Sequence, residues 1–124
     1  MKFDFADKHV VVTGGARGIG LQVVRQFLDA GATVAVWEYS TESIESARHD
    51  LAAFGTRATF QQVDVSKPAS VELAAQALPF DIDILINNAG ITRDKSFAKM
   101  STEDFDAVID TNLAGVFHVT KNLL

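Results

Sequence analysis

Four glycines fall within seven residues near the start of this chain, in the stretch Thr13-Gly14-Gly15-Ala16-Arg17-Gly18-Ile19-Gly20. A short β-branched run, residues 9–12, precedes this stretch, and apolar residues at helical spacing follow it over residues 18–30. Glycines between a strand and a helix allow a tight turn, close helix packing and the approach of a pyrophosphate to the backbone. The helix N-terminus then offers free N–H groups to the phosphates. The spacing therefore predicts a dinucleotide-binding turn rather than a plain strand-to-helix connection.

Strand-like runs recur along the rest of the chain. They cover residues 33–37, 58–63 and 82–86, in addition to residues 9–12. Longer helical patterns separate them, so the chain alternates strand and helix. This order predicts an α/β fold with a doubly wound parallel sheet of about four strands and helices on both faces. No linker interrupts the pattern, and we expect a single domain over residues 1–124.

The helical patterns have recognisable beginnings and ends. One covers residues 41–54 and is closed by Gly55. Ser66 can cap the next helix, with Pro68 in its first turn. Ser101, with Asp104 three residues on, resembles a capping box at the start of a last, long helix.

Composition excludes several classes of function. Eleven basic and sixteen acidic residues give a net charge of −5, which disfavours binding to nucleic acid or an anionic membrane. The chain has no cysteine, so disulfides and thiolate nucleophiles are excluded, and its three histidines show no metal-ligand spacing. Residues 1–8 carry acids where a signal peptide needs an apolar stretch, and no apolar run approaches membrane-spanning length, so we expect neither a signal peptide nor a membrane span. We therefore expect a soluble, cytoplasmic protein with no metal.

Two acidic residues follow predicted strands at positions where open α/β sheets bind ligands. Glu38 lies twenty residues past Gly18. An acid there accepts hydrogen bonds from the ribose hydroxyls of NAD(H) and repels the 2′-phosphate of NADP(H). Arg17 mildly favours NADP(H), because its positive charge suits the 2′-phosphate. Taken together, the two residues favour NAD(H), and NADP(H) stays possible. The alternatives are a solvated surface acid for Glu38 and a helix-capping acid for Asp64, which follows the third strand.

Asn112 lies on the apolar stripe of the last helix, three residues after Ile109. An amide on a buried face costs free energy unless it is hydrogen-bonded. Asn112 is therefore either a satisfied core residue with a structural role or a functional one.

Four motifs in order resemble those of the short-chain dehydrogenases/reductases. They are the glycine turn at 13–20, Asp64-Val65, Asn87-Asn88-Ala89-Gly90 and Asn112. The resemblance implies a truncated Rossmann-type sheet of strand order 3-2-1-4. The stretch Asn87-Asn88-Ala89-Gly90-Ile91-Thr92-Arg93-Asp94 is most similar to 3-oxoacyl-carrier-protein reductases and acetoacetyl-CoA reductases.

The resemblance also implies roles for individual residues. Asp64 would contact the adenine amino group, the Val65 N–H the adenine ring, and Ile19 the nicotinamide side. Asn112 would distort its helix and hold a water that relays protons to an active-site lysine, which makes it the one candidate catalytic residue. The candidate cofactor-binding residues are Gly14, Arg17, Gly18, Ile19, Gly20, Glu38, Asp64, Val65, Asn88, Ala89 and Gly90.

The resemblance implies that the chain is part of an oxidoreductase that transfers hydride between a nicotinamide dinucleotide and a carbonyl, with a 3-oxoacyl thioester as the expected substrate. The family's catalytic Ser, Tyr and Lys are missing, since the sole tyrosine is Tyr39. We therefore expect a cofactor-binding half without the catalytic half, inactive alone. The alternatives are a non-catalytic dinucleotide-binding module and a truncated scaffold. An open edge at residues 82–86 and an apolar last helix predict a homo-oligomer.

Overall fold

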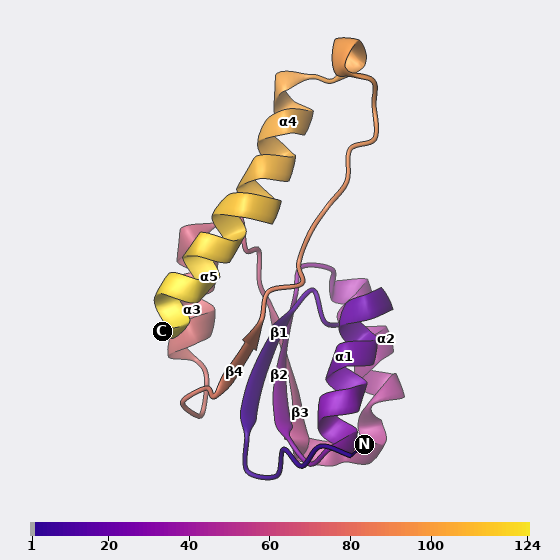
Figure 1. The fold of residues 1–124 in the computed structure, drawn as a ribbon, viewed down its shortest axis with the longest axis vertical. Coiled ribbons are helices and arrows are strands. Elements are labelled where there is room, and N and C mark those ends of the chain that lie inside the picture. Colours follow the sequence, from indigo (N-terminus) through magenta and orange to yellow (C-terminus); the bar gives the residue numbers. More distant parts are fainter. Residues whose placement is uncertain (1) are drawn as a thin grey trace.

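Four parallel strands lie in the order β3-β2-β1-β4 in the computed structural model, which describes residues 2–124 (Figure 1). The predicted strand order is confirmed. The strands are β1 (His9–Thr13), β2 (Thr33–Glu38), β3 (Ala58–Gln62) and β4 (Ile84–Ile86). Val11 lies opposite Ala35 of β2 and Leu85 of β4. β4 begins two residues later than predicted and lies at the edge of the sheet.

The central strand β1 is apolar on both faces because helices cover both sides of the sheet. Helices α1 (Gly18–Asp29) and α2 (Thr41–Asp50) lie on one side, against a core that includes Val10 and Val12. Helices α3 (Pro68–Gln76) and α5 (Gly115–Leu123) lie on the other side, against Val11, Ala35 and Trp37. The two-residue period of a strand divides neighbouring valines between these two cores.

Helix α2 ends earlier than predicted. It stops at Asp50, and a 3₁₀ segment, η1 (Ala52–Arg57), follows. Gly55 within that segment has a φ of +60° and a ψ of −134°, a non-helical conformation that suits glycine, and it kinks the segment. Arg57 then holds the return to β3, because its guanidinium donates to the Leu28 and Ala32 carbonyls at 3.0 and 3.1 Å.

The predicted cap of α3 is wrong. Lys67, not Ser66, is the N-cap residue, and its side chain makes no capping hydrogen bond. The Ser66 hydroxyl instead donates to Asp64 Oδ1 at 2.6 Å. Ser66 therefore belongs to the turn after β3, and Pro68, whose fixed φ suits a first helical turn, starts the helix.

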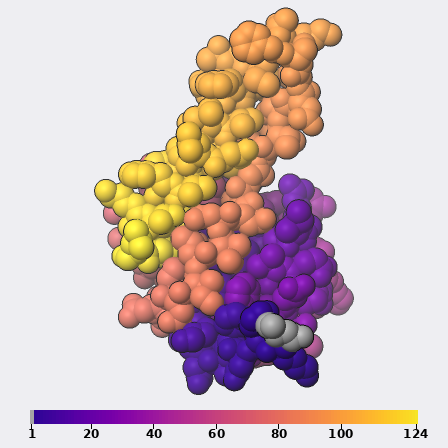
Figure 2. Space-filling model, in the orientation of Figure 1, coloured from indigo at the N-terminus to yellow at the C-terminus, as the bar shows by residue number. Residues whose placement is uncertain are grey.

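The last helix is continuous but not uniform. It consists of α4 (Thr102–Ile109), a π-helical turn η3 (Asp110–Ala114) and α5. Ser101 caps it as predicted, since its Oγ accepts from the Asp104 N–H at 3.1 Å. With a loop that carries the short 3₁₀ turn η2 (Phe97–Lys99), α4 forms an arm that projects from the body (Figure 2). Within residues 2–124, no helix has the length and apolar content needed to cross a bilayer.

Candidate functional site

A cavity of about 790 Å³ opens at the carboxyl ends of the strands. This is the edge at which open parallel sheets bind ligands, and the volume is that of a small-molecule site. All the predicted cofactor-binding residues line it, from Gly14 in the glycine-rich turn to Gly90 after β4. Asn112 does not line it, although its neighbour Thr111 does.

The glycine-rich turn can exist only with glycine at certain positions. Gly18 has a φ of +57°, which side-chain-bearing residues adopt at a cost. A Cβ on Gly20 would lie 2.1 Å from the Gly14 carbonyl oxygen and 2.5 Å from Asn88 Nδ2. The first turn of α1 therefore packs directly on the backbone of the turn before it.

The N-terminus of α1 lies at this turn and has no side-chain cap. Arg17 is the N-cap residue in an extended conformation, and no side chain of residues 2–124 accepts from the first turn at this position. Gly18, Ile19 and Gly20, the first residues of the helix, line the cavity. The first N–H groups of a helix have no intrahelical acceptor and carry the positive end of its dipole. The arrangement is therefore suited to an anion such as a diphosphate.

Thr13 joins the turns that follow β1 and β4. Its side chain is buried, and Oγ1 accepts from the N–H groups of Asn88 and Ala89, both at 3.0 Å. Asn88 Nδ2 in turn donates to the Gly14 carbonyl at 3.0 Å. Two walls of the cavity thus hold each other in place. The sequence offered Thr13 only as the first residue of the glycine motif, and its bridging role was missed.

Glu38 is not a solvated surface acid, because it is only 8% exposed. One carboxylate oxygen, Oε1, accepts from the Ala16 N–H at 3.2 Å. The other, Oε2, accepts from the N–H groups of Tyr39 and Ser40 at 3.0 and 3.3 Å. The carboxylate lines the cavity and also contacts the glycine-rich turn. Tyr39, at the same end of the cavity, is exposed.

Asp64 lies at the end of β3, and the structure does not make it a helix cap. Its Oδ1 accepts from the N–H and the hydroxyl of Ser66, at 3.0 and 2.6 Å. Its own N–H donates to Ser70 Oγ at 2.9 Å. These bonds hold the carboxylate beside the cavity, next to the buried Val65.

Asn112 is exposed, so the prediction that it lies on a buried face is wrong. It lies in the middle of the π turn η3, where the helix widens. Its side chain bonds the segment after β4, with Oδ1 accepting from the Ile91 N–H and Nδ2 donating to the Ile91 carbonyl. The apolar stripe around it faces outward as well, which is why helical spacing alone misjudged its burial.

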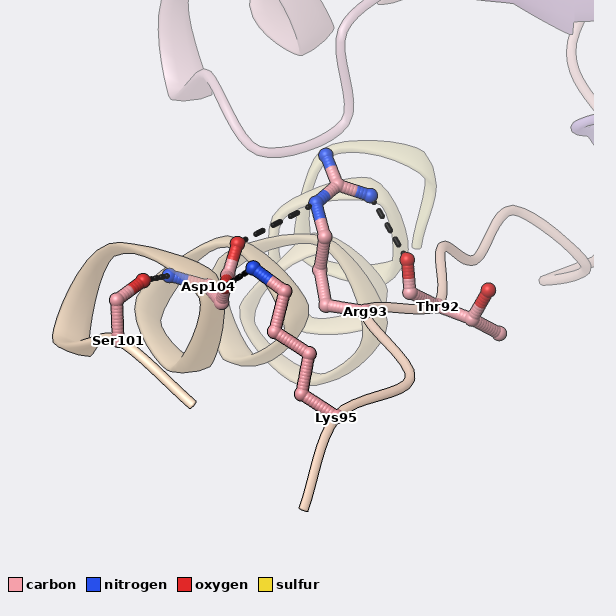
Figure 3. A network of polar contacts seen from close by, with 5 residues as sticks. All are labelled: Thr92, Arg93, Lys95, Ser101 and Asp104. Carbon is pink, nitrogen blue, oxygen red and sulfur yellow. Dashed lines mark hydrogen bonds and ion pairs between the residues drawn. The ribbon is translucent and has the colours of Figure 1, made fainter. Parts of the chain in front are cut away.

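A network of polar contacts at the arm joins Arg93, Lys95 and Ser101 to Asp104 (Figure 3). Asp104 receives a hydrogen bond from Lys95 Nζ, and Arg93 Nε lies 3.8 Å from its other oxygen. The hydrogen bonds from Lys95 and Ser101 hold the pKa of the Asp104 carboxyl below its ordinary value. The network fastens the loop before η2 to the first turn of α4. Only the Ser101–Asp104 spacing gave a sequence signal for it.

Comparison with known proteins agrees with this geometry. Residues 8–124 match the family described as short chain dehydrogenase, and the chain belongs to that family of oxidoreductases. It is 39% identical over 127 residues to the 3-oxoacyl-[acyl-carrier-protein] reductase FabG of Chlamydia pneumoniae, covering 100% of this chain and 51% of that protein. It is 42% identical over 120 residues to the oxidoreductase UcpA of Escherichia coli K12, covering 94% and 45%.

Solved structures give the same result. A putative short-chain dehydrogenase from Novosphingobium aromaticivorans superposes with a TM-score of 0.91 at 34% identity, over 97% of this chain and 45% of that one. The RhlG/NADP active-site complex of Pseudomonas aeruginosa gives a TM-score of 0.89 at 31% identity, over 98% and 48%. The chain spans about half the length of the curated relatives it matches.

Proposed function

We propose that this chain binds a nicotinamide dinucleotide as the cofactor-binding part of a reductase that transfers hydride to a carbonyl group. The observation that carries the proposal is the uncapped N-terminus of α1 at a glycine-rich turn, opening into the cavity at the strand ends. When bound there, the dinucleotide would supply the hydride. The chain's own contribution is to hold it, with the first turn of α1 at the diphosphate and Asp64 and Val65 at the adenine.

The proposed substrate is a 3-oxoacyl thioester. Support comes from the stretch 87–94 and from the similarity to proteins named 3-oxoacyl-[acyl-carrier-protein] reductase. The general acid/base chemistry of carbonyl reduction needs a proton donor matched to neutral pH. The one tyrosine in the sequence, Tyr39, follows β2 beside Glu38, at the end of the cavity proposed for the adenosine and not for the nicotinamide. We therefore expect the 124-residue chain to bind the cofactor without turning over the substrate.

We propose that Asn112 contributes indirectly to the reaction, by fixing the backbone of a proton relay. Its side chain is committed to Ile91. The π turn around it changes the hydrogen-bond pattern of the helix, and we propose that a main-chain carbonyl of this turn holds a water. That water would relay protons to a lysine outside the 124 residues. The amide thus fixes the backbone, and the backbone would carry the relay.

We further propose that NAD(H) binds more tightly than NADP(H). The buried Glu38 carboxylate lines the cavity at the position expected for the adenosine ribose, and a 2′-phosphate there would meet its negative charge. Arg17 lines the same cavity and would reduce the difference.

Trp37 allows a direct test, because it is the only tryptophan, is buried and borders the cavity. The chain is titrated with NADH and then with NADPH, following Trp37 emission and energy transfer to the nicotinamide. We expect saturable binding of both, tighter for NADH. No binding of either by a chain that circular dichroism shows to be folded would refute the proposal. A turnover assay with a 3-oxoacyl thioester separates an active reductase from a binding module.

A further inference from the structure

We propose that Glu38 is a positioning residue that braces the glycine-rich turn through Ala16, whether or not it also contacts the ribose. The inference rests on the proposed function only for the identity of the ligand. Its structural basis is the hydrogen bond from the Ala16 N–H to Glu38 Oε1, which joins the end of β2 to the middle of the turn.

The carboxylate is oriented inward by its environment. At 8% exposure it has lost most of its water, and within residues 2–124 no Lys, Arg or His forms an ion pair with it. A buried charge of this kind requires hydrogen-bond donors in place of solvent. The three N–H groups of Ala16, Tyr39 and Ser40 supply them. Hydrogen bonds to an ionised acceptor are about twice as strong as those between neutral groups.

The brace completes a set of attachments that fix the turn before any ligand binds. The Gly14 N–H donates to the Trp37 carbonyl at 2.7 Å, and the Gly14 carbonyl accepts from Asn88 Nδ2 at 3.0 Å. Ala16 lies between Gly14 and Gly18, which both have positive φ. Its hydrogen bond to Glu38 is a second attachment of the turn to β2. Glycine-rich backbone loses more conformational freedom on ordering than any other. A turn ordered in advance binds its ligand with a smaller entropic cost.

Two other roles for the same carboxylate make different predictions. If Glu38 only accepts from the ribose hydroxyls, its replacement leaves the free chain unchanged. If Glu38 only accepts from the N–H groups of Tyr39 and Ser40 before α2, its replacement speeds amide exchange at the start of α2 and leaves exchange at Ala16 unchanged. A carboxylate has about four acceptor positions and uses three here, so a ribose contact remains compatible with the brace.

The first test is amide hydrogen exchange of the free 124-residue chain, measured by NMR for the wild type and Glu38→Gln. The glutamine replaces one acceptor oxygen with a donor, so it cannot accept from all three N–H groups. We expect exchange at Ala16 to become about tenfold faster or more, while amides of β1 are unchanged. Glu42→Gln removes the same charge from an exposed site in the first turn of α2 and should leave Ala16 unchanged. Unchanged exchange at Ala16 in Glu38→Gln would overturn the proposal.

The second test separates bracing from ribose contact by ligand chemistry. Glu38→Asp keeps the charge and shortens the side chain, which safeguards folding. Bracing predicts that Glu38→Asp weakens the binding of 2′,3′-dideoxy-ADP as well as that of ADP, because the loss through the turn does not depend on the ribose hydroxyls. A loss confined to ADP would overturn it. If the wild type binds neither nucleotide, the proposed function fails, and the exchange experiment alone still decides the role of Glu38.

Discussion

The side-chain amide of Asn112 forms a pair of hydrogen bonds with the backbone of Ile91. Oδ1 accepts from the Ile91 N–H at 2.8 Å and Nδ2 donates to the Ile91 carbonyl at 3.0 Å. The amide therefore matches both polar groups of one residue, as a neighbouring strand would. This pair joins the π turn η3 to the segment that leaves β4, and both elements border the cavity.

Replacement of Asn112 by alanine should loosen this junction. Both bonds are exposed, and a neutral hydrogen bond contributes about 0.5–1.5 kcal/mol net. We expect Asn112→Ala to lower the free energy of unfolding by about 2 kcal/mol in urea titrations, with faster exchange of the Ile91 amide. Asn122→Ala is the matched control, since that side chain bonds only the His118 carbonyl within its own helix. Equal losses in the two variants would contradict the junction.

Gly18 and Gly20 should respond differently to alanine although they are two residues apart. Gly18 has a positive φ but open space around it, so Gly18→Ala should cost only the backbone strain, about 1 kcal/mol. Gly20→Ala places a methyl group against the Gly14 carbonyl and should cost about 3 kcal/mol and abolish NADH binding. Gly55→Ala controls for strain alone, because Gly55 has a φ of +60° in η1 and nothing within 4 Å. Similar NADH affinity in wild type and Gly20→Ala would refute the close-packing argument.

The sheet and the location of the cavity could be predicted because they depend on local signals. The alternation of strands and helices predicts the parallel sheet, and the glycine turn between β1 and α1 marks its binding edge. Strand polarity then brings Asp64 and Asn88 to the same edge, although 24 residues separate them in the sequence.

The directions of individual side chains could not be predicted. Glu38 turns inward because of Ala16, a residue 22 positions earlier. Asn112 bonds Ile91, 21 positions earlier, from an exposed position that the apolar spacing assigned to a buried face. Such contacts form only once the elements are assembled, and an amphipathic pattern does not distinguish a face that packs inward from one that packs on another surface.

The lowered pKa of Asp104 predicts how the stability of the fold depends on pH. Its pKa lies below the ordinary value of about 3.9 because Lys95 and Ser101 donate hydrogen bonds to it. A carboxyl with a lowered pKa in the folded state stabilises the fold fully above its unfolded pKa, and the contribution is lost as pH falls through the folded pKa. The difference in stability between wild type and Asp104→Asn should therefore be constant near neutrality and shrink below about pH 4.

An NMR titration of the Asp104 carboxyl tests the cause of this shift. Lys95→Met should raise the pKa of Asp104 toward its ordinary value, because the hydrogen bond that lowers this pKa most is lost. Lys99→Met, in η2 of the same loop, removes an equal charge from a residue that does not contribute to the shift of Asp104, and it should leave the titration nearly unchanged. A pKa of Asp104 that does not respond to Lys95→Met would contradict the role of the pair.

The outward apolar face of the last helix predicts self-association. Leu113 is 66% exposed there, between other exposed apolar residues of α4 and α5, and contiguous apolar surface of this kind favours burial against a partner. In sedimentation equilibrium, we expect the apparent mass to rise above 13.4 kDa with concentration. Leu113→Asp should keep the chain at that mass, because a charge on the face would have to be desolvated. Leu73→Asp, at a site 68% exposed on α3, should associate like the wild type. A wild-type chain that remains a monomer at all concentrations would refute the prediction, and association retained by Leu113→Asp would point to the open edge of β4 instead.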